Sequence, residues 1–285
     1  MTNRFEIAID GATLVGESDG FGLPVVFLHA RVTDRRMWSE QMREVADAGF
    51  HVISYDRRGS GESESPDEPF SHLADLEAVL DRLSVHAAIL VGASQGGAIA
   101  IDFGLEHPER TIGLVLVGTS LGGAPEPELP EEAEALFDAR DYAEQRQQTA
   151  SVNRIDAHLW LDGPLEESGR VEGPIRELFL EMNEKRLDKP ALTEEEEIDT
   201  AADHVGAITA PVLLVVGDLD FPHIVERHEE LSEELENAFA VTLEGAAHLP
   251  SLERPDLFNP LLLEFLEAVA GGGEGEDADG PDEGD

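Results

Sequence analysis

The stretch Ile89-Leu90-Val91-Gly92-Ala93-Ser94-Gln95-Gly96-Gly97-Ala98-Ile99-Ala100 decides the fold of this 285-residue chain. An apolar run of strand length leads into a Gly-x-Ser-x-Gly, and an Ala- and Ile-rich helical segment follows it at once. In that context the serine sits on a strained strand-to-helix turn, and small residues two before and two after it let the backbone fold tightly. We therefore predict that Ser94 is a nucleophile whose hydroxyl stands clear of a sheet.

The residue after this serine is expected to take part through its backbone. The N–H of Gln95 lies at the N-terminus of the next helix, where partial positive charge and an unpaired donor favour an oxyanion. Gly-x-Ser-x-Gly alone is a weak signal, because glycine and serine are common in turns. The flanking strand and helix, together with partners further along the chain, favour an active serine over a plain loop serine.

Two later stretches supply the acid and the base that such a serine needs. Residues 210–220 form a buried-strand pattern that ends on a glycine and two carboxylates, Asp218 and Asp220. After one more helical segment, a strand at 238–244 leads to His248. A neutral imidazole takes the serine proton, and a carboxylate on its other nitrogen fixes the tautomer. The candidate acid and the candidate base each follow the C-terminal end of a strand, where open α/β sheets place their active sites.

Five motifs in order resemble those of the α/β-hydrolase fold family, in its single-domain, capped form. They are Phe27-Leu28-His29-Ala30-Arg31 with Met37-Trp38, Tyr55-Asp56-Arg57-Arg58-Gly59-Ser60-Gly61-Glu62-Ser63, Gly92-Ala93-Ser94-Gln95-Gly96-Gly97, Gly217-Asp218-Leu219-Asp220, and Gly245-Ala246-Ala247-His248 followed by Glu253-Arg254-Pro255. The resemblance extends from the N-terminus to about Val269. It implies that the acid lies three residues after the strand-ending glycine, which selects Asp220 over Asp218. It also implies an oxyanion hole formed by the backbone N–H groups of Arg31 and Gln95.

The chain departs from the family at one position. Family members usually have His-Gly after the third strand, and this chain has His29-Ala30. A methyl group there narrows the space beside the oxyanion hole and restricts φ. Because alanine is still small, we keep the prediction of an oxyanion hole here and expect Ala30 to border the substrate pocket. The resemblance implies that His29 shapes the oxyanion loop and has no catalytic role.

Strands and helices alternate along most of the chain. Strands are predicted near 5–9, 13–17, 25–29, 51–55, 87–92, 111–118, 212–217 and 238–244, and helices near 35–48, 71–84, 95–107, 223–236 and 257–269. This alternation predicts an α/β fold with a mostly parallel eight-stranded sheet and helices on both faces. Asp10-Gly11 is a hairpin-type turn, so the first two strands are expected to pair antiparallel. Residues 1–120 and 204–270 are assigned to this α/β-hydrolase core.

The alternation stops between the sixth strand and the acid-bearing strand, where the family inserts a helical cap. We assign residues 121–203 to such a cap, which would exclude water and supply the substrate pocket. Trp160 faces that pocket or pins the cap to the core, and the sequence leaves both open. Leu249, beside His248, is a further expected pocket wall.

Acidic residues dominate the composition. The chain holds 62 Asp and Glu against 19 Lys and Arg, a formal net charge of −43, and only two lysines. This composition resembles that of cytoplasmic proteins from salt-accumulating halophiles. An acidic surface that binds a basic partner fits less well, because the acid is spread along the chain. The sign of the charge excludes nucleic acid as a partner. Residues 271–285 contain only Gly, Ala, Pro and acid and are predicted to be disordered.

The acidity leads to a prediction about salt. Folding brings like charges together, and molar KCl shortens the screening length to about 3 Å. The melting temperature is therefore expected to rise markedly from low salt to molar KCl, with activity following. Deleting the tail should change little, because a flexible segment keeps its charges apart. Melting curves that stay flat in both the full-length and the tail-deleted protein would show that the acidity serves another purpose.

The remaining features limit the function. No cysteine, basic-then-apolar leader or apolar run of membrane length is present, so we expect a cytoplasmic protein without membrane contact. No group of residues has the spacing of metal ligands, and Gly20-Phe21-Gly22 is not followed by the helix of a dinucleotide-binding loop, so no metal or cofactor is predicted.

The motifs favour a serine hydrolase that cleaves a carboxylic ester or lactone of a small molecule through an acyl-enzyme. A serine nucleophile argues against the dehalogenase and epoxide-hydrolase branches. Several alternatives on the same fold stay open: acyl transfer, C–C bond hydrolysis, cofactor-free haloperoxidase or perhydrolase chemistry, and a non-catalytic small-molecule sensor. The sequence also leaves the oligomeric state open.

Overall fold

The computed structural model describes residues 2–196 and 200–272. The last helix runs on to Gly272, two residues into the segment that we expected to be a disordered tail. The rest of that segment, 273–285, lies outside the described residues.

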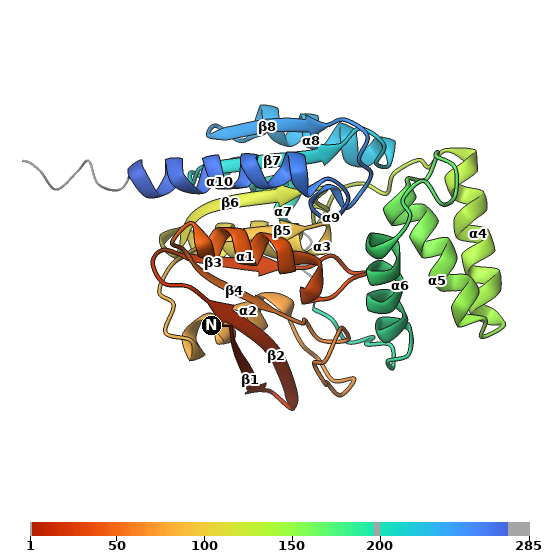
Figure 1. The fold of residues 1–285 in the computed structure, drawn as a ribbon, viewed down its shortest axis with the longest axis horizontal. Helices are drawn as coiled ribbons and strands as arrows, with labels where there is room; N and C mark the ends of the chain where they lie inside the picture. Colours follow the sequence, from red (N-terminus) through yellow and green to blue (C-terminus); the bar gives the residue numbers. More distant parts are fainter. Residues whose placement is uncertain (1, 197–199, 273–285) are drawn as a thin grey trace, which may run out of the picture.

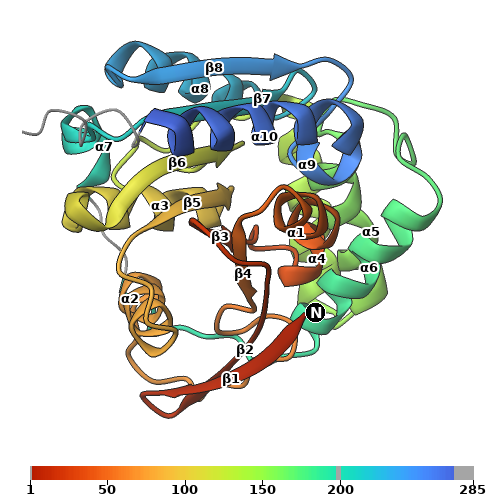
Figure 2. The same ribbon diagram turned by 60° about the vertical axis from the view of Figure 1, so that its left-hand side comes forward.

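An eight-stranded sheet forms the centre of the molecule (Figure 1). The strands are β1 (Asn3–Ile9), β2 (Ala12–Asp19), β3 (Pro24–Leu28), β4 (His51–Tyr55), β5 (Ala88–Ala93), β6 (Thr111–Val117), β7 (Val212–Gly217) and β8 (Ala238–Leu243). Their order is β1-β2-β4-β3-β5-β6-β7-β8, with β1 and β8 at opposite edges (Figure 2). β2 pairs antiparallel with β1 and with β4, and all other described pairs are parallel. The predicted α/β-hydrolase fold and the antiparallel first hairpin are confirmed.

Helices cover both faces of this sheet. They are α1 (Ser39–Asp47), α2 (His72–Arg82), α3 (Gln95–Glu106), α8 (Pro222–Glu234), α9 (Pro250–Glu253) and α10 (Pro255–Gly272), with the short turns Arg35–Trp38, Pro108–Arg110, α7 (Ala201–His204) and Val205–Ala207. Because side chains alternate along a strand, β3 sends Val25 and Phe27 to one face and Val26 and Leu28 to the other. The first pair packs in the core cluster beneath α1 and α10, and the second in the cluster beneath α2, α3 and α8.

The central strands are buried on both sides. Every residue of β5 and β7 is buried, as expected for parallel strands covered by helices on both faces. The edge strand β8 is mostly part-exposed, and its Phe239 is 63% exposed. β5 lies between β3 and β6, so the residue that follows it, Ser94, stands at the middle of the sheet.

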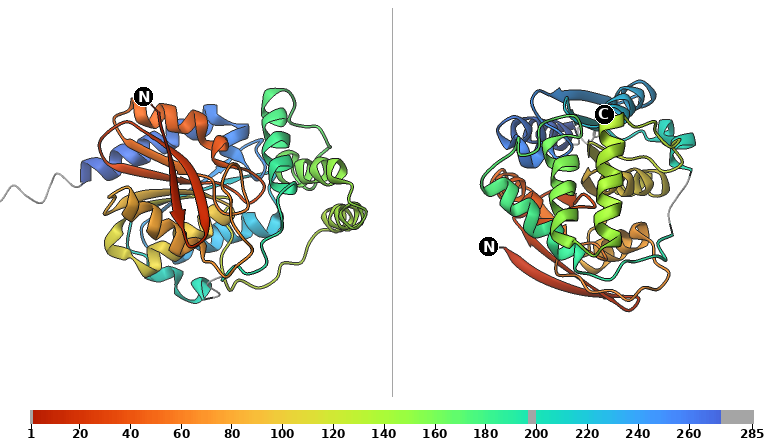
Figure 3. Two further views of the ribbon diagram at one scale, coloured as in Figure 1. Left: turned by 90° about the horizontal axis from the view of Figure 1, so that it is seen from below. Right: turned by 90° about the vertical axis from the view of Figure 1, so that its right-hand side faces the viewer.

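Most of the helical segments between β6 and β7 gather at one end of the sheet, whereas α7 lies against the core (Figures 1 and 3). Those at the end of the sheet are α4 (Glu131–Gln145), α5 (Thr149–Ala157), the π-helical turn His158–Asp162 and α6 (Pro174–Leu187). Phe179 and Met182 of α6 are fully buried in the same cluster as the core residues beneath α1. Helices thus occupy the segment after the sixth strand, and its assignment as a cap stays a prediction.

The chain returns from this insertion along the core. Lys189 Nζ donates a hydrogen bond of 2.7 Å to the Ser63 carbonyl, and Phe70 bridges to Glu195 in a short parallel contact. The boundaries at 121 and 203 stay predictions. Within the described residues, no helix combines the length and apolar character needed to cross a bilayer.

Candidate active site

Ser94 occupies a strained turn between β5 and α3. Its φ of 53° and ψ of −119° lie outside the usual regions for a residue with a side chain, and its N–H donates to the Val117 carbonyl at 2.8 Å. A Cβ at Gly92 would lie 2.3 Å from the Gly96 carbonyl oxygen, and one at Gly96 would lie 2.3 Å from that of Leu28. Both glycines of the motif are therefore required for the chain to pass this closely.

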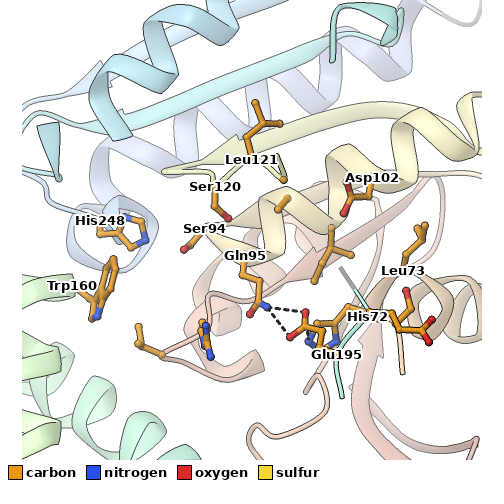
Figure 4. A pocket seen from close by; sticks show the side chains of 17 residues that line it. His72, Leu73, Ser94, Gln95, Asp102, Ser120, Leu121, Trp160, Glu195 and His248 are labelled. Carbon is orange, nitrogen blue, oxygen red and sulfur yellow. Dashed lines mark hydrogen bonds and ion pairs between the residues drawn. The ribbon is translucent and has the colours of Figure 1, made fainter. Parts of the chain in front are cut away.

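The structure brings Asp220 and His248 into direct contact. His248 Nδ1 lies 2.9 and 3.0 Å from the two carboxylate oxygens of Asp220, and both residues are buried. The carboxylate places the proton on Nδ1, which leaves Nε2 to act as a base. Nε2 is buried without a hydrogen-bond partner in the described part of the chain. Figure 4 shows the Ser94 hydroxyl directed toward the His248 ring.

The rival carboxylate lies elsewhere. Asp218 is exposed, and its Oδ1 accepts a 2.7 Å hydrogen bond from the backbone N–H of Gly245. It therefore supports the turn before the loop that carries His248, and Asp220 is the one that contacts the imidazole.

The loop that follows β3 is fixed by a neutral histidine. His29 Nε2 accepts from the backbone N–H of Arg57 at 3.0 Å, and Nδ1 donates to the Ala30 carbonyl at 2.7 Å. Burial lowers the pKa of His29 to about 3, so its ring stays neutral. This geometry matches the shaping role expected for His29, and it holds Arg31 at the rim of the cavity that Ser94 and His248 line.

A cavity of 390 Å³ lies over Ser94. Arg31, Gln95 and Trp160 line it, as expected for the oxyanion loop and the cap. The Trp160 ring is centred 4.9 Å from that of His248 and also 4.9 Å from that of Phe221. Trp160 therefore faces the cavity and also joins the helices after β6 to the core, which are the two positions that the sequence left open.

Two of the expected pocket residues do not reach this cavity. Ala30 and Leu249 are fully buried in the hydrophobic core, and neither is among the described residues that line the cavity. Their neighbours in sequence, His29 and His248, are held by polar contacts, and the two apolar side chains turn inward instead.

Sequence reasoning also missed several residues that do line the cavity. His72, Asp102, Ser120 and Glu195 come from separate segments and carry no motif. Burial lowers the pKa of His72 well below its ordinary value, and its Nδ1 is buried without a partner in the described part of the chain. Gln95 Nε2 donates to Glu195 at 3.1 Å, so the Gln95 side chain points away from Ser94 (Figure 4).

A buried ion pair fixes the loop that carries His248. Glu253 accepts hydrogen bonds from the backbone N–H groups of Ala247 and Leu249, on either side of His248. Burial raises the pKa of Glu253, an effect opposed by these N–H groups and by its contact with Arg170. Arg170 also donates to the carbonyls of Leu161, next to Trp160, and of Gly245. The Arg170–Glu253 pair thus links the cap to the histidine loop.

We expect Glu253→Gln to slow labelling of Ser94 by a fluorophosphonate probe about 10- to 100-fold. The amide of glutamine cannot accept from both backbone N–H groups and Arg170, so His248 loses its exact position, and small displacements of reacting groups carry costs of this size. Arg170→Met should have a similar effect, and the double variant should be little worse than either single one. Arg254→Gln, which removes the exposed pair with Asp256 and a hydrogen bond to the Glu244 carbonyl but no contact with Glu253 or Arg170, is the control. Unchanged labelling in Glu253→Gln would contradict the positioning role.

Known proteins match the chain over most of its length. A family model described as "Alpha/beta hydrolase family" matches residues 25–261. The structure of a thermophilic esterase from Thermogutta terrifontis superimposes with a TM-score of 0.76 at 27% identity, covering 94% of this chain and 99% of that one. Est816, described as an N-acyl homoserine lactone degrading enzyme, gives a TM-score of 0.70 at 27% identity, covering 91% of this chain and 99% of that one.

Some curated relatives match over shorter segments, and others over most of their length. The AB hydrolase superfamily protein YisY of Bacillus subtilis is 40% identical over 98 residues, which are 33% of this chain and 37% of that protein. Two further matches likewise span less than half the length of the relatives, at 45% and 34%. These two are named a putative non-heme haloperoxidase and an epoxide hydrolase. Epoxide hydrolase A of Mycobacterium tuberculosis is 25% identical over 87% of this chain and 92% of that protein.

Proposed function

The chain belongs to the alpha/beta hydrolase family, and on that premise we propose that it is a serine hydrolase that cleaves a carboxylic ester or lactone of a small molecule. The observation that carries the proposal is the contact between Asp220 and His248 beside a cavity that Ser94 also lines. Two structural neighbours support the substrate class, because one is named as an esterase and the other as degrading an acyl lactone.

The reaction follows from this arrangement. Ser94 Oγ attacks the carbonyl carbon while His248 Nε2 takes the hydroxyl proton, and Asp220 stabilises the imidazolium. The backbone N–H groups of Arg31 and Gln95 receive the negative charge on the carbonyl oxygen. The C–O bond then breaks and His248 gives its proton to the leaving alkoxide. Water attacks the acyl-enzyme with His248 again as base, which releases the acid and restores the serine.

The identity of the nucleophile separates this proposal from epoxide opening. A carboxylate that opens an epoxide forms an ester, which water can cleave at the carbonyl. A serine that opened an epoxide would form an ether, which this machinery cannot hydrolyse. Ser94 at the elbow therefore supports acyl chemistry, although some relatives are named as epoxide hydrolases.

A substrate panel in molar KCl tests the proposal. It comprises p-nitrophenyl acetate and butyrate, γ- and δ-lactones, a β-diketone, styrene oxide, and peroxide with bromide. We expect a burst of p-nitrophenolate equal to the enzyme concentration, then steady turnover, with an acyl adduct detected on Ser94 by mass spectrometry. A competing alcohol reports acyl transfer through its ester product. The proposal would be overturned if the enzyme turned over only the epoxide, or only peroxide with bromide, and no ester or lactone. It would also be overturned if esters bound without being hydrolysed.

A further inference from the structure

A second cavity beside the first concentrates positive charge. It has a volume of 360 Å³. Its cationic lining consists of Arg31, Arg57, Arg58, Arg140, Arg186 and Lys189. These are six of the 19 Lys and Arg residues in a chain with 62 acidic ones, and only Glu144 and Glu195 add carboxylates to the lining. We call it the basic cavity.

The basic cavity adjoins the active-site cavity and lies between the core and the cap. The two cavities share Arg31, His72, Gln95 and Glu195 as lining residues. The side chain of Gln95 extends from the end next to Ser94 toward Glu195 and His72, where the two spaces meet (Figure 4). A molecule that places its carbonyl at Ser94 can therefore extend into the basic cavity.

Three of the six cations are neutralised by carboxylates behind the lining. Arg58 forms a buried pair with Asp75, with its Nε 2.8 Å from the carboxylate. Arg140 and Arg186 both contact Asp156, at 2.7 and 3.2 Å. These three cations are held in place by carboxylates of the protein, although Arg140 and Arg186 share Asp156 and Arg140 also contacts Glu144 at 3.0 Å.

The other three form no direct ion pair with a carboxylate within the described residues, although the Glu195 carboxylate partly opposes, through space, the lowering of the pKa of Arg57 by burial. Lys189 Nζ donates to a backbone carbonyl, and Arg31 forms no ion pair in that part of the chain. Arg57 donates to the Gln95 Oε1 at 2.9 Å and to the His29 carbonyl at 3.1 Å, both neutral acceptors. The six cations of the basic cavity thus face two carboxylates in the lining, Glu144 and Glu195, and Asp75 and Asp156 behind it. Positive charge is therefore in excess around the cavity.

Arg57 is the least expected of these residues. It is 2% exposed, and its Nε is buried without a hydrogen-bond partner in the described part of the chain. Burial lowers the pKa of Arg57 to about 10, so it stays protonated at neutral pH. Burying a guanidinium is costly, and the Glu195 carboxylate in the same lining opposes only part of that cost, because the pKa of Arg57 is still lowered. An anion in the cavity would oppose more of it.

We propose that the basic cavity binds an anionic oxygen group, a carboxylate or a phosphate, carried by the molecule whose acyl group Ser94 attacks. The planar fork of a guanidinium matches both groups, and an ammonium adds a point charge. Long-range repulsion from the acidic surface is screened in molar salt, and contacts inside the cavity are screened much less. The attack by Ser94 rests on the proposed function, and the binding of the anion does not.

Paired esters test the preference for charge. The mono-p-nitrophenyl esters of glutarate and adipate are compared with p-nitrophenyl 5-methylhexanoate, in which an isopropyl group replaces the glutarate carboxylate. In molar KCl we expect the anionic esters to have a kcat/KM at least about tenfold higher, through a lower KM. Lys189→Met and Arg31→Gln should each reduce this ratio about tenfold, the size of one charge-assisted hydrogen bond. Arg43→Gln, an exposed cation on α1, is the matched control and should keep the ratio.

Ligand binding separates this inference from the proposed function. Glutarate and inorganic phosphate are titrated calorimetrically into the Ser94→Ala protein, in which no turnover occurs, and tested as inhibitors of the neutral ester. Binding that Lys189→Met, Arg31→Gln or Arg57→Gln weakens and Arg43→Gln does not would support the site, even if no ester were hydrolysed. The ligand that binds more tightly, glutarate or phosphate, identifies the anionic group that the basic cavity prefers. The inference is overturned, with the proposed function intact, if neutral esters are hydrolysed while neither ligand binds. Binding that does not compete with the ester overturns the assignment of the anion to the substrate.

Discussion

Ser94→Ala is expected to lower kcat for an ester substrate by roughly 10⁶-fold, the loss seen when the nucleophile of a triad is removed. In the proposed mechanism no other group replaces the hydroxyl, because His248 and Asp220, which contact each other, only activate it. The backbone at this position already carries a Cβ at φ 53°, so alanine leaves the turn unchanged. The measurement combines steady-state rates on a p-nitrophenyl ester with labelling by a fluorophosphonate probe, and both signals should disappear together.

Ser120 provides a control for this experiment, since it lines the same cavity but follows β6 and not an elbow. The Ser120→Ala protein should still be labelled. Labelling that persists in Ser94→Ala and disappears in Ser120→Ala would identify Ser120 as the nucleophile instead of Ser94.

The parts of the site that the sequence predicted follow local rules. Ser94 is predicted as the nucleophile because an apolar strand, two glycines and a helix occur within twelve residues, and the structure places both glycines in close contact with backbone. Asp220 and His248 each follow a strand, and parallel strands bring their carboxyl ends to one edge of the sheet. A rule that covers a short segment can be applied without knowledge of the tertiary structure.

The rest of the cavity depends on long-range packing. Arg57, His72 and Glu195 meet only because the segment that returns from the cap lies along the loops before α2. No spacing in the sequence brings these residues together. Leu249 shows the opposite error, because adjacency to His248 in sequence does not give its side chain the same direction.

Composition gives no sign of a basic site when charge is unevenly distributed. The net charge is −43, yet six of the 19 Lys and Arg residues line one cavity. Average charge describes solubility and the response to salt, whereas recognition depends on the few groups within contact distance. The basic cavity could be found only after the cap had placed Arg140 and Arg186 opposite the core.

Asp220→Asn is expected to lower kcat by roughly 10⁴-fold with little change in the fold. The side-chain amide has the shape of the carboxylate, but its NH₂ group can donate to Nδ1, which favours the tautomer with the proton on Nε2. That nitrogen then has no lone pair to accept the Ser94 proton, and the imidazolium formed during attack loses its counter-charge. The measurement is kcat and KM on the same ester, with KM expected to stay within a few-fold.

Asp218→Asn is the matched comparison, because the same change is made two residues away on an exposed side chain. Asp218 accepts one hydrogen bond, from the Gly245 N–H, and asparagine can still accept it through its oxygen. Its activity should therefore stay within a few-fold of the parent. If instead Asp218→Asn lost the activity and Asp220→Asn retained it, the contact at His248 Nδ1 would have no catalytic role. Equal small losses in both would mean that His248 holds its tautomer without a carboxylate, and the triad would reduce to a serine–histidine pair.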